Sequence, residues 1–305
     1  MINYCLIGAG SMGSNHLRVM HNMGLSIKAI VEPQPRDDFP AALKDRLISS
    51  IDDLPMDIDA AVIAVPTVLH ADITQQIVDA GVKKIFIEKP AFIDPQPYLQ
   101  AGIDLMVGYI ELFNPAFECV RQVLSENRLG KIKRISSSRL GGPPRDYKKA
   151  KSVIWDLAVH DIRFVEALLG SAVNFDHCAV RRNQGVVSSA LISAGHGDIM
   201  ISFDASWDVA NKKRTLEIFG ENGYMHVDLA QQEAFMRHNE FTRKGNLDFL
   251  GNMMWSAFAE EVKFGIVKEE PLKREIAFFD TCCKTGDFPF YDISFNTRIE
   301  GLVHV

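Results

Sequence analysis

Short apolar runs alternate with amphipathic stretches over roughly the first third of the chain. The runs are rich in Ile and Val, as parallel strands buried on both faces usually are. They lie at residues 4–7, 26–31, 60–65, 84–87 and 103–107. Helical spacing between them predicts helices at residues 12–23 and 69–80, each followed by a glycine. This alternation predicts an α/β fold with a doubly wound parallel sheet of the Rossmann type.

The pattern changes at about residue 113. Helices are predicted at 115–126 and 153–169, and the residues from 245 to 268 do not distinguish helix from strand. Alternating segments separated by turn residues then predict strands at 175–182, 186–194, 198–207, 215–219 and 224–228. A succession of hairpins indicates an α+β domain with a large open, mostly antiparallel sheet. We therefore predict a Rossmann domain at 1–114 and an α+β domain at 115–305.

Composition excludes several classes of protein. The chain has 305 residues and a formal net charge of -6, which is unlike a nucleic-acid-binding protein. It has neither the roughly 18–20 apolar residues of a membrane span nor a basic start typical of a signal peptide. The odd number of cysteines and the absence of a C-x-x-C pair argue against disulfides and structural zinc: Cys5, Cys119, Cys178, Cys282 and Cys283. We expect a cytoplasmic protein with reduced thiols and no bound metal.

A glycine-rich motif follows the first predicted strand and opens the first predicted helix. Its sequence is Gly8-Ala9-Gly10-Ser11-Met12-Gly13. Gly8 permits a tight turn, Gly10 lets a pyrophosphate approach the backbone, and Gly13 lets helix and strand pack closely. The helix N-terminus adds free N–H groups and the positive end of the helix dipole. In this context the motif predicts a dinucleotide site rather than an accidental cluster of glycines.

Glu32 ends the second predicted strand, 24 residues after Gly8. A carboxylate there accepts hydrogen bonds from ribose hydroxyls and repels a 2′-phosphate, which favours NAD over NADP. Arg36 is the contrary signal, because an arginine nearby can pair with that phosphate.

Ionisable residues follow the third and fourth strands. Val65-Pro66-Thr67 ends the third strand with His70 shortly after it, and Glu88-Lys89-Pro90 ends the fourth. Because ligands of open α/β sheets bind at the carboxyl ends of the strands, we expect Lys89 where a nicotinamide meets its substrate. A solvated lysine is the alternative.

A second group lies in the predicted α+β domain. Asp156 and His160 are four residues apart, so they share one face of the predicted helix, which Arg163 extends. Ionisable residues on a largely apolar helix suggest the wall of a binding site, although a buried histidine with a structural role is the common alternative.

These motifs together resemble the glucose–fructose oxidoreductase/inositol dehydrogenase/MocA (Gfo/Idh/MocA) family of NAD(P)-dependent dehydrogenases. The resemblance implies that Lys89 and His160 flank the reacting carbinol and that Asp156 supports them. It also implies a set of cofactor-binding residues: Gly8, Gly10, Ser11, Met12, Gly13, Glu32, Val65, Pro66, Thr67, His70, Glu88 and Lys89.

Two longer segments, 107–115 and 155–162, resemble the branch of UDP-N-acetylglucosamine 3-dehydrogenases. Tyr109 and Leu112 stand where that branch usually has histidine and arginine. The resemblance implies oxidation of UDP-N-acetylglucosamine to its 3-keto form. The substrate-binding residues predicted on this basis, together with the basic residues described next, are Tyr109, Asn114, Arg139, Arg145, Asp156 and His160.

A basic segment interrupts the acidic chain. It contains Lys131, Lys133, Arg134, Arg139, Arg145, Lys148, Lys149 and Lys151, opposed only by Asp146. Arginines in this segment could bind a diphosphate through paired N–H groups. A solvated positive surface explains the same pattern.

We expect an NAD-dependent oxidoreductase in which His160 is the base and Lys89 stabilises the charge developing on the substrate oxygen. The two roles could be exchanged. The expected partners are a sugar or nucleotide sugar and further copies of the chain, forming a homodimer or homotetramer through the uncovered sheet. The alternatives are a dehydrogenase of a free sugar or cyclitol, a glycoside-cleaving enzyme that oxidises transiently, and a non-catalytic NAD-binding regulator.

Overall fold

The computed structural model describes residues 1–35, 39–92, 102–143, 152–238, 261–289, 292 and 294–303. The chain divides into two compact units. The first comprises Met1–Ile110 and Glu270–Glu300, and the second comprises Glu111–Glu269 and Gly301–Val305. The boundary therefore falls at 110/111 rather than 114/115, and part of the predicted second domain belongs to the first unit.

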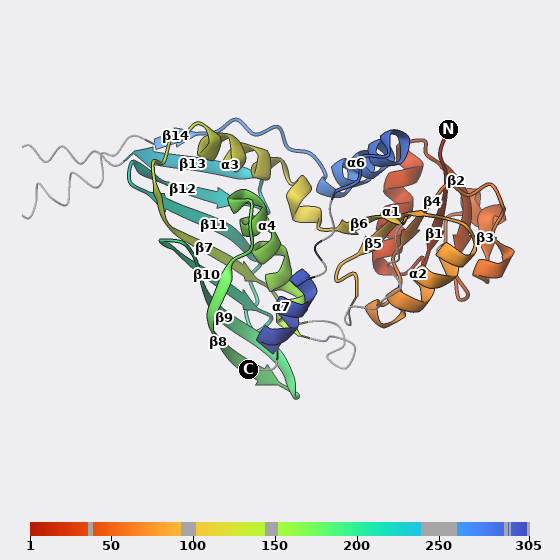
Figure 1. Cartoon of the computed structure of the whole chain (residues 1–305), viewed down its shortest axis with the longest axis horizontal. Helices are drawn as coiled ribbons and strands as arrows, with labels where there is room; N and C mark the ends of the chain where they lie inside the picture. Colours follow the sequence, from red (N-terminus) through yellow and green to blue (C-terminus); the bar gives the residue numbers. More distant parts are fainter. Residues whose placement is uncertain are drawn as a thin grey trace, which may run out of the picture. The chain divides into compact units, whose positions relative to one another are not determined.

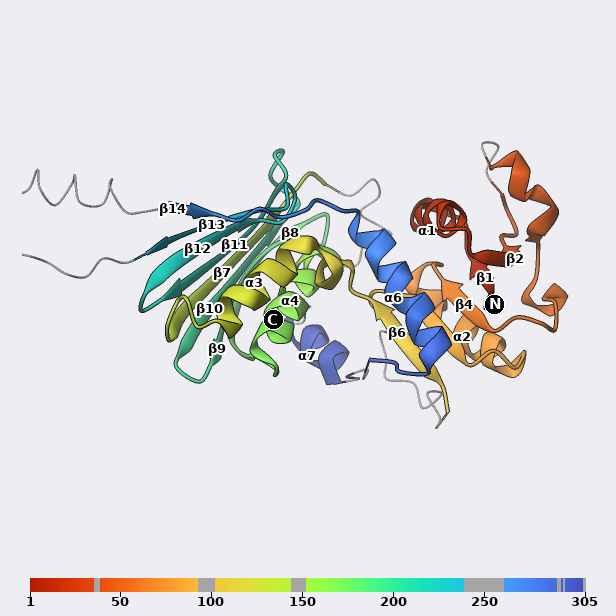
Figure 2. The same cartoon turned by 90° about the horizontal axis from the view of Figure 1, so that it is seen from above.

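The first unit contains a six-stranded sheet with strand order β3-β2-β1-β4-β5-β6, in which every pairing is parallel. The strands are β1 (Asn3–Ile7), β2 (Ser26–Val31), β3 (Leu47–Ile48), β4 (Ala60–Ile63), β5 (Lys84–Glu88) and β6 (Asp104–Gly108). Helices α1 (Ser11–Asn22) and α2 (His70–Asp79) cover opposite faces (Figures 1 and 2), because right-handed crossovers leave β1 and β4 in opposite directions. The described parts of the connections contain three short 3-10 helices: η1 (Ala41–Arg46), η2 (Ile51–Asp53) and η3 (Thr67–Leu69). The predicted Rossmann fold is confirmed.

Helix α6 (Pro271–Thr285) completes the first unit on the side of α1. Its Phe279 is buried against Phe86 of β5, with ring centroids 5.6 Å apart. The hydroxyl of Tyr4 on β1 donates a hydrogen bond of 2.7 Å to Asp280. This packing explains why the segment belongs to the first unit, although it follows the second domain in sequence.

The second unit contains an eight-stranded sheet with strand order β14-β13-β12-β11-β7-β10-β9-β8. Only the β7–β10 pairing is parallel among these described strands. The strands are β7 (Ile132–Leu140), β8 (Asn174–Asn183), β9 (Val186–His196), β10 (Ile199–Ser206), β11 (Lys213–Gly220), β12 (Gly223–Asp228), β13 (Glu233–His238) and β14 (Glu261–Lys263). The helical segments are η4 (Ile110–Phe113), α3 (Pro115–Ser125), η5 (Ile154–Ala158), α4 (Val159–Leu169) and, across the C-terminal boundary of the units, α7 (Ser294–Val303). The predicted mostly antiparallel sheet is confirmed.

Strand β7 lies in the middle of this sheet but is not predicted from the sequence. Its inward side chains include Ser137 and Arg139, both buried. The alternation of apolar and polar residues that identifies a half-buried strand is therefore weak in β7.

Helices α3 and α4 lie on one face of the eight-stranded sheet (Figure 2). The predicted packing through the uncovered sheet requires apolar side chains on its open face. In β10 this holds for Met200, which is 69 % exposed, but not for Ile201 and Phe203, which are buried because they point towards the helices. Ser202 and Asp204 share the open face with Met200, so this stretch of it is largely polar.

Candidate functional site

The glycine loop after β1 has the geometry that a dinucleotide requires. Gly8 has a φ of +88°, and a Cβ added to Gly13 would lie 1.9 Å from the carbonyl oxygen of Gly8. A Cβ on Gly10 would meet nothing within 4 Å, so its backbone borders open space. Helix α1 begins at Ser11 without a side-chain cap. Its first N–H groups are therefore not capped by a side chain, and the loop fits a pyrophosphate.

Glu32 is held against this loop. Its Oε2 accepts a hydrogen bond of 2.8 Å from the backbone N–H of Ala9, and its Oε1 accepts one of 3.0 Å from Gln34. A carboxylate oxygen can accept a second hydrogen bond, so this position suits the ribose hydroxyls. Arg36 lies outside the described residues.

His70 ties together the segments that follow β4 and β5. Its Nδ1 lies 3.0 Å and 2.9 Å from the carbonyl oxygens of Pro90 and Ala91, and its Nε2 lies 3.0 Å from that of Val65. The side chain is 1 % exposed, and burial lowers its pKa despite these three contacts. The prediction that His70 contacts the cofactor directly disagrees with this burial. Its position instead fixes the segments that carry Lys89 and Val65.

Glu88 forms a pair that the sequence analysis did not predict. Its Oε1 lies 2.7 Å from Nε2 of His16, a fully buried residue of α1, and its Oε2 accepts a 3.3 Å hydrogen bond from the backbone N–H of Lys89. The only sequence signal was a polar residue on the apolar face of α1, between buried Gly13 and Leu17. The pair fixes the backbone from which the half-buried Lys89 projects.

Asp156 and His160 lie on two different kinds of helix. The predicted continuous α-helix is wrong at its start, because residues Ile154–Ala158 form a π-helix before α4 begins. A π-turn of this kind is common at functional sites. Asp156 is exposed, and its Oδ2 accepts a 3.1 Å hydrogen bond from the indole N–H of buried Trp207. Trp207 was not predicted as a site residue, because its only signal in the sequence was its place at the end of a predicted strand.

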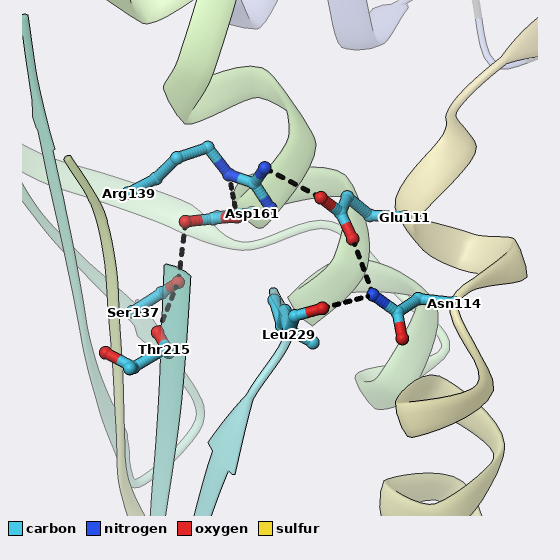
Figure 3. Close-up of polar contacts among 7 residues, drawn as sticks. All are labelled: Glu111, Asn114, Ser137, Arg139, Asp161, Thr215 and Leu229. Atoms are coloured by element: carbon cyan, nitrogen blue, oxygen red, sulfur yellow. Dashed lines mark hydrogen bonds and ion pairs between the residues drawn. The ribbon is translucent and has the colours of Figure 1, made fainter. Parts of the chain in front are cut away.

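Arg139 lies at the centre of a buried charged network (Figure 3). Its Nε donates a 2.6 Å hydrogen bond to Asp161 and its Nη1 a 2.7 Å hydrogen bond to Glu111. The arginine is 1 % exposed, which disagrees with the predicted contact between Arg139 and a substrate. Burial alone would raise the pKa of Glu111, but the charge of Arg139, together with the hydrogen bonds from Arg139 and Asn114, lowers that pKa overall. Arg139 therefore links α4 to the chain segment before α3.

Two further side chains complete the network. Ser137 donates a 2.7 Å hydrogen bond to Asp161. Asn114 donates to Glu111 and to the carbonyl of Leu229, at 3.0 Å and 2.9 Å, while its own oxygen caps the first turn of α3. Asn114 is 2 % exposed, so its predicted role in substrate binding also disagrees with the structure.

Comparison with known proteins identifies the family. Residues 2–100 match the model of the oxidoreductase family with an NAD-binding Rossmann fold, and residues 117–226 match that of the GFO/IDH/MocA C-terminal domain. The inositol 2-dehydrogenase of Rhizobium meliloti is 33 % identical over 86 % of this chain and 87 % of its own length. The chain belongs to the Gfo/Idh/MocA family. It is thus an NAD(P)-dependent oxidoreductase with an NAD-binding Rossmann domain.

Two further proteins are similar over most of the chain. The UDP-N-acetylglucosamine 3-dehydrogenase of Acidithiobacillus ferrooxidans is 25 % identical over 76 % of each chain. The solved structure of the UDP-N-acetylglucosamine 3-dehydrogenase GnnA from that organism superimposes with a TM-score of 0.79 at 19 % identity, covering 99 % of this chain and 95 % of the other. At this identity the superposition shows a shared fold.

In this Gfo/Idh/MocA protein, fewer residues of the basic segment are available to bind an anion than the sequence suggests. Lys131 and Lys133 form exposed ion pairs of 2.6 Å and 2.7 Å with Asp198 and Glu221. Residues 144–151, including Arg145, lie outside the described part of the chain. The predicted diphosphate contact of Arg145 therefore stays a prediction.

Tyr109, another residue predicted to bind the substrate, is 7 % exposed and packs edge-on against Phe295, with ring centroids 5.6 Å apart. Within the described ranges, no three His, Cys, Asp or Glu side chains are grouped as metal ligands. No helix of the described chain is long and apolar enough to cross a membrane.

Proposed function

We propose that this oxidoreductase uses NAD to oxidise a secondary hydroxyl group of a sugar or cyclitol. The observation that carries the proposal is Asp156, held by Trp207 on the turn before His160. An aspartate fixed in this way beside a histidine suits a residue that controls proton transfer at a carbinol. The glycine loop and Glu32 support NAD as the acceptor of the hydride.

The proposed roles follow from what each side chain can do. NAD, when bound, accepts the hydride from the carbinol carbon. His160 takes the hydroxyl proton, since imidazole titrates near neutral pH, and Lys89 donates a hydrogen bond to the same oxygen as negative charge develops. Lys89 and His160 belong to different units, so their convergence on one oxygen is part of the proposal. Lys89 could be the base and His160 the hydrogen-bond donor.

The proposed substrate is UDP-N-acetylglucosamine, oxidised to the 3-keto sugar. Similarity to a UDP-N-acetylglucosamine 3-dehydrogenase supports it. A free cyclitol is the second candidate, because the inositol 2-dehydrogenase is 33 % identical over most of both chains. A non-catalytic regulator would not need Lys89 and His160 together.

Assembly is part of this proposal. We propose a homodimer or homotetramer that packs through the open face of the eight-stranded sheet. Exposed Leu191, Met200 and Phe219 support it, at 56 %, 69 % and 37 % exposure. A mass of about 34 kDa by light scattering at every concentration would contradict it.

The test is to mix the purified protein with NAD or NADP and each of a panel of compounds, and to follow NADH absorbance. We expect net NADH formation with UDP-N-acetylglucosamine and tighter binding of NAD than NADP. Net NADH from myo-inositol instead would identify the second candidate. Product formation without net NADH would indicate transient oxidation, and no reaction across the panel would contradict dehydrogenase activity on these substrates.

A further inference from the structure

Arg214 is a second arginine on the helix-covered face of the eight-stranded sheet. It lies on β11 directly opposite Arg139 of β7 in the strand register. Directly opposed side chains of neighbouring strands point to the same face, and Arg139 reaches Asp161 of α4 on that face. Arg214 therefore lies on the side of the sheet that carries α4 and the π-helix before it.

The two arginines differ in the hydrogen bonds and ion pairs that their guanidinium groups form. Arg139 is buried and bonded to two carboxylates. Arg214 is half-buried, and no hydrogen bond or ion pair to its guanidinium occurs within the part of the chain that the structure describes. Its backbone carbonyl accepts a 2.8 Å hydrogen bond from the N–H of Leu229. A half-buried guanidinium with several free N–H donors is suited to an external acceptor.

The strand register places Arg214 near the proposed reaction site, because Arg139 lies between it and Ala205 of β10, two residues before the Trp207 that bonds Asp156. Burial and then the charge of Arg139 lower its pKa, whereas Glu111, Asp161 and Asp156 act in the opposite direction. Arg214 is thus within electrostatic reach of Asp156. Glu111 and Asp161 are already bonded to Arg139, so an added anion would pair with Arg214 rather than replace an existing partner.

We propose that Arg214 binds an anionic group of the substrate, a phosphate or a carboxylate, beside Asp156. The inference rests on the proposed function, because it assumes that the substrate hydroxyl reacts near Asp156 and His160. The planar guanidinium presents paired N–H groups that match both phosphate and carboxylate oxygens. It replaces Arg139 as the arginine expected to recognise a diphosphate.

A purely structural role for Arg214 is the competing explanation. Its charge could serve only to balance the acidic groups on this face of the sheet. That role predicts an effect on folding stability, whereas anion recognition predicts a selective effect on ligand affinity.

The experiment compares Arg214→Gln and Arg214→Lys with Arg121→Gln as the control. Arg121 is exposed on α3, away from the open face of the sheet, where its Nη2 donates a 2.8 Å hydrogen bond to Glu118 of the same helix. Each protein is saturated with NAD and titrated calorimetrically with UDP, UDP-N-acetylglucosamine, inorganic phosphate, glucuronate and myo-inositol. Circular dichroism and the melting temperature establish that each variant is folded, and Arg214→Lys retains the charge if Arg214→Gln does not fold.

We expect Arg214→Gln to lower the affinity for those anionic ligands that bind to wild type. The expected loss is roughly 10- to 100-fold, because charge-assisted hydrogen bonds are removed. Arg214→Lys should weaken their binding less, and Arg121→Gln should match wild type. Affinity for NAD and for myo-inositol should not change in any variant. Loss of UDP binding alone identifies a phosphate, and loss of glucuronate binding alone identifies a carboxylate.

The inference would be overturned if folded Arg214→Gln bound the anionic ligands with unchanged affinity. If only Arg214→Lys folds, unchanged affinity of that variant would overturn it. A wild-type protein that binds none of these ligands would also overturn it. The proposed function is tested separately, by the reduction of NAD. Wild type that oxidises myo-inositol but binds no anion leaves the dehydrogenase standing and removes the role of Arg214. Wild type that binds UDP through Arg214 but never reduces NAD does the reverse.

Discussion

Replacing Arg139 with methionine should strongly destabilise the second unit. The substitution leaves the side chains of Glu111 and Asp161 largely buried, at 13 % and 3 % exposure, without the cation that lies 2.7 Å and 2.6 Å from them. Removing one partner of a buried ion pair typically costs about 3–5 kcal/mol, because an uncompensated charge stays in a poorly solvated site. For a domain of this size, each kcal/mol lowers the melting temperature by roughly 2–4 °C.

The expected result is therefore a fall of roughly 6–20 °C in the melting temperature of the transition assigned to the second unit. Differential scanning calorimetry at neutral pH measures it, with Arg121→Gln on the exposed side of α3 as the control. Combining Arg139→Met with Glu111→Gln and Asp161→Asn should recover part of the loss, because no buried charge then remains unpaired. A melting temperature for Arg139→Met equal to that of the control would refute the reasoning.

Three other substitutions test separate parts of the structure. The pKa of Glu111 is lowered in the folded chain, so its ionised form stabilises the protein at a pH above the unfolded pKa of about 4.3, and this stabilisation is lost as the pH falls through the folded pKa. Glu111→Gln should therefore be less stable than wild type at pH 7 and equally stable in acid. A difference in the free energy of unfolding that stays constant with pH, measured by denaturant unfolding, would contradict this. Gly13→Ala places a Cβ 1.9 Å from the carbonyl oxygen of Gly8 and should abolish NAD binding measured by calorimetry, so wild-type affinity would argue against the loop. Trp207→Phe removes the donor to Asp156 and should lower kcat by roughly tenfold while NAD affinity stays constant; steady-state kinetics with unchanged kcat would give Trp207 a packing role only.

Most of the Rossmann half of the fold could be predicted because five of its six strands carry apolar residues at successive positions, whereas the two-residue strand β3 was not predicted. The carboxyl ends of such strands lie on one edge of the sheet, so Glu32, Glu88 and Lys89 could be located at that edge from sequence alone. His16 could not be assigned a partner, because its contact with Glu88 joins residues far apart in the chain.

The second half was predicted less completely, for identifiable physical reasons. Arg139 resembled its basic neighbours in sequence, but alternation along β7 turns it inward, whereas Arg134 points to the open face and is exposed. A helical pattern identifies α6 as a helix without indicating which sheet it covers. The spacing of Asp156 and His160 fits an α-helix and a π-turn nearly equally, so the π-helix required the structure. Opposition of Arg214 to Arg139 depends on strand register, which sequence did not determine.

The central claim is that Lys89 and His160 act together on one substrate oxygen. The most direct measurement is the turnover number of Lys89→Ala, His160→Ala and the double variant, together with calorimetric NAD affinity for each. We expect each single variant to lose about 10²–10⁴-fold in turnover, the double variant to lose far less than the product of the two, and NAD affinity to stay near wild type. Near wild-type turnover in either single variant, or losses that multiply in the double variant, would contradict the account.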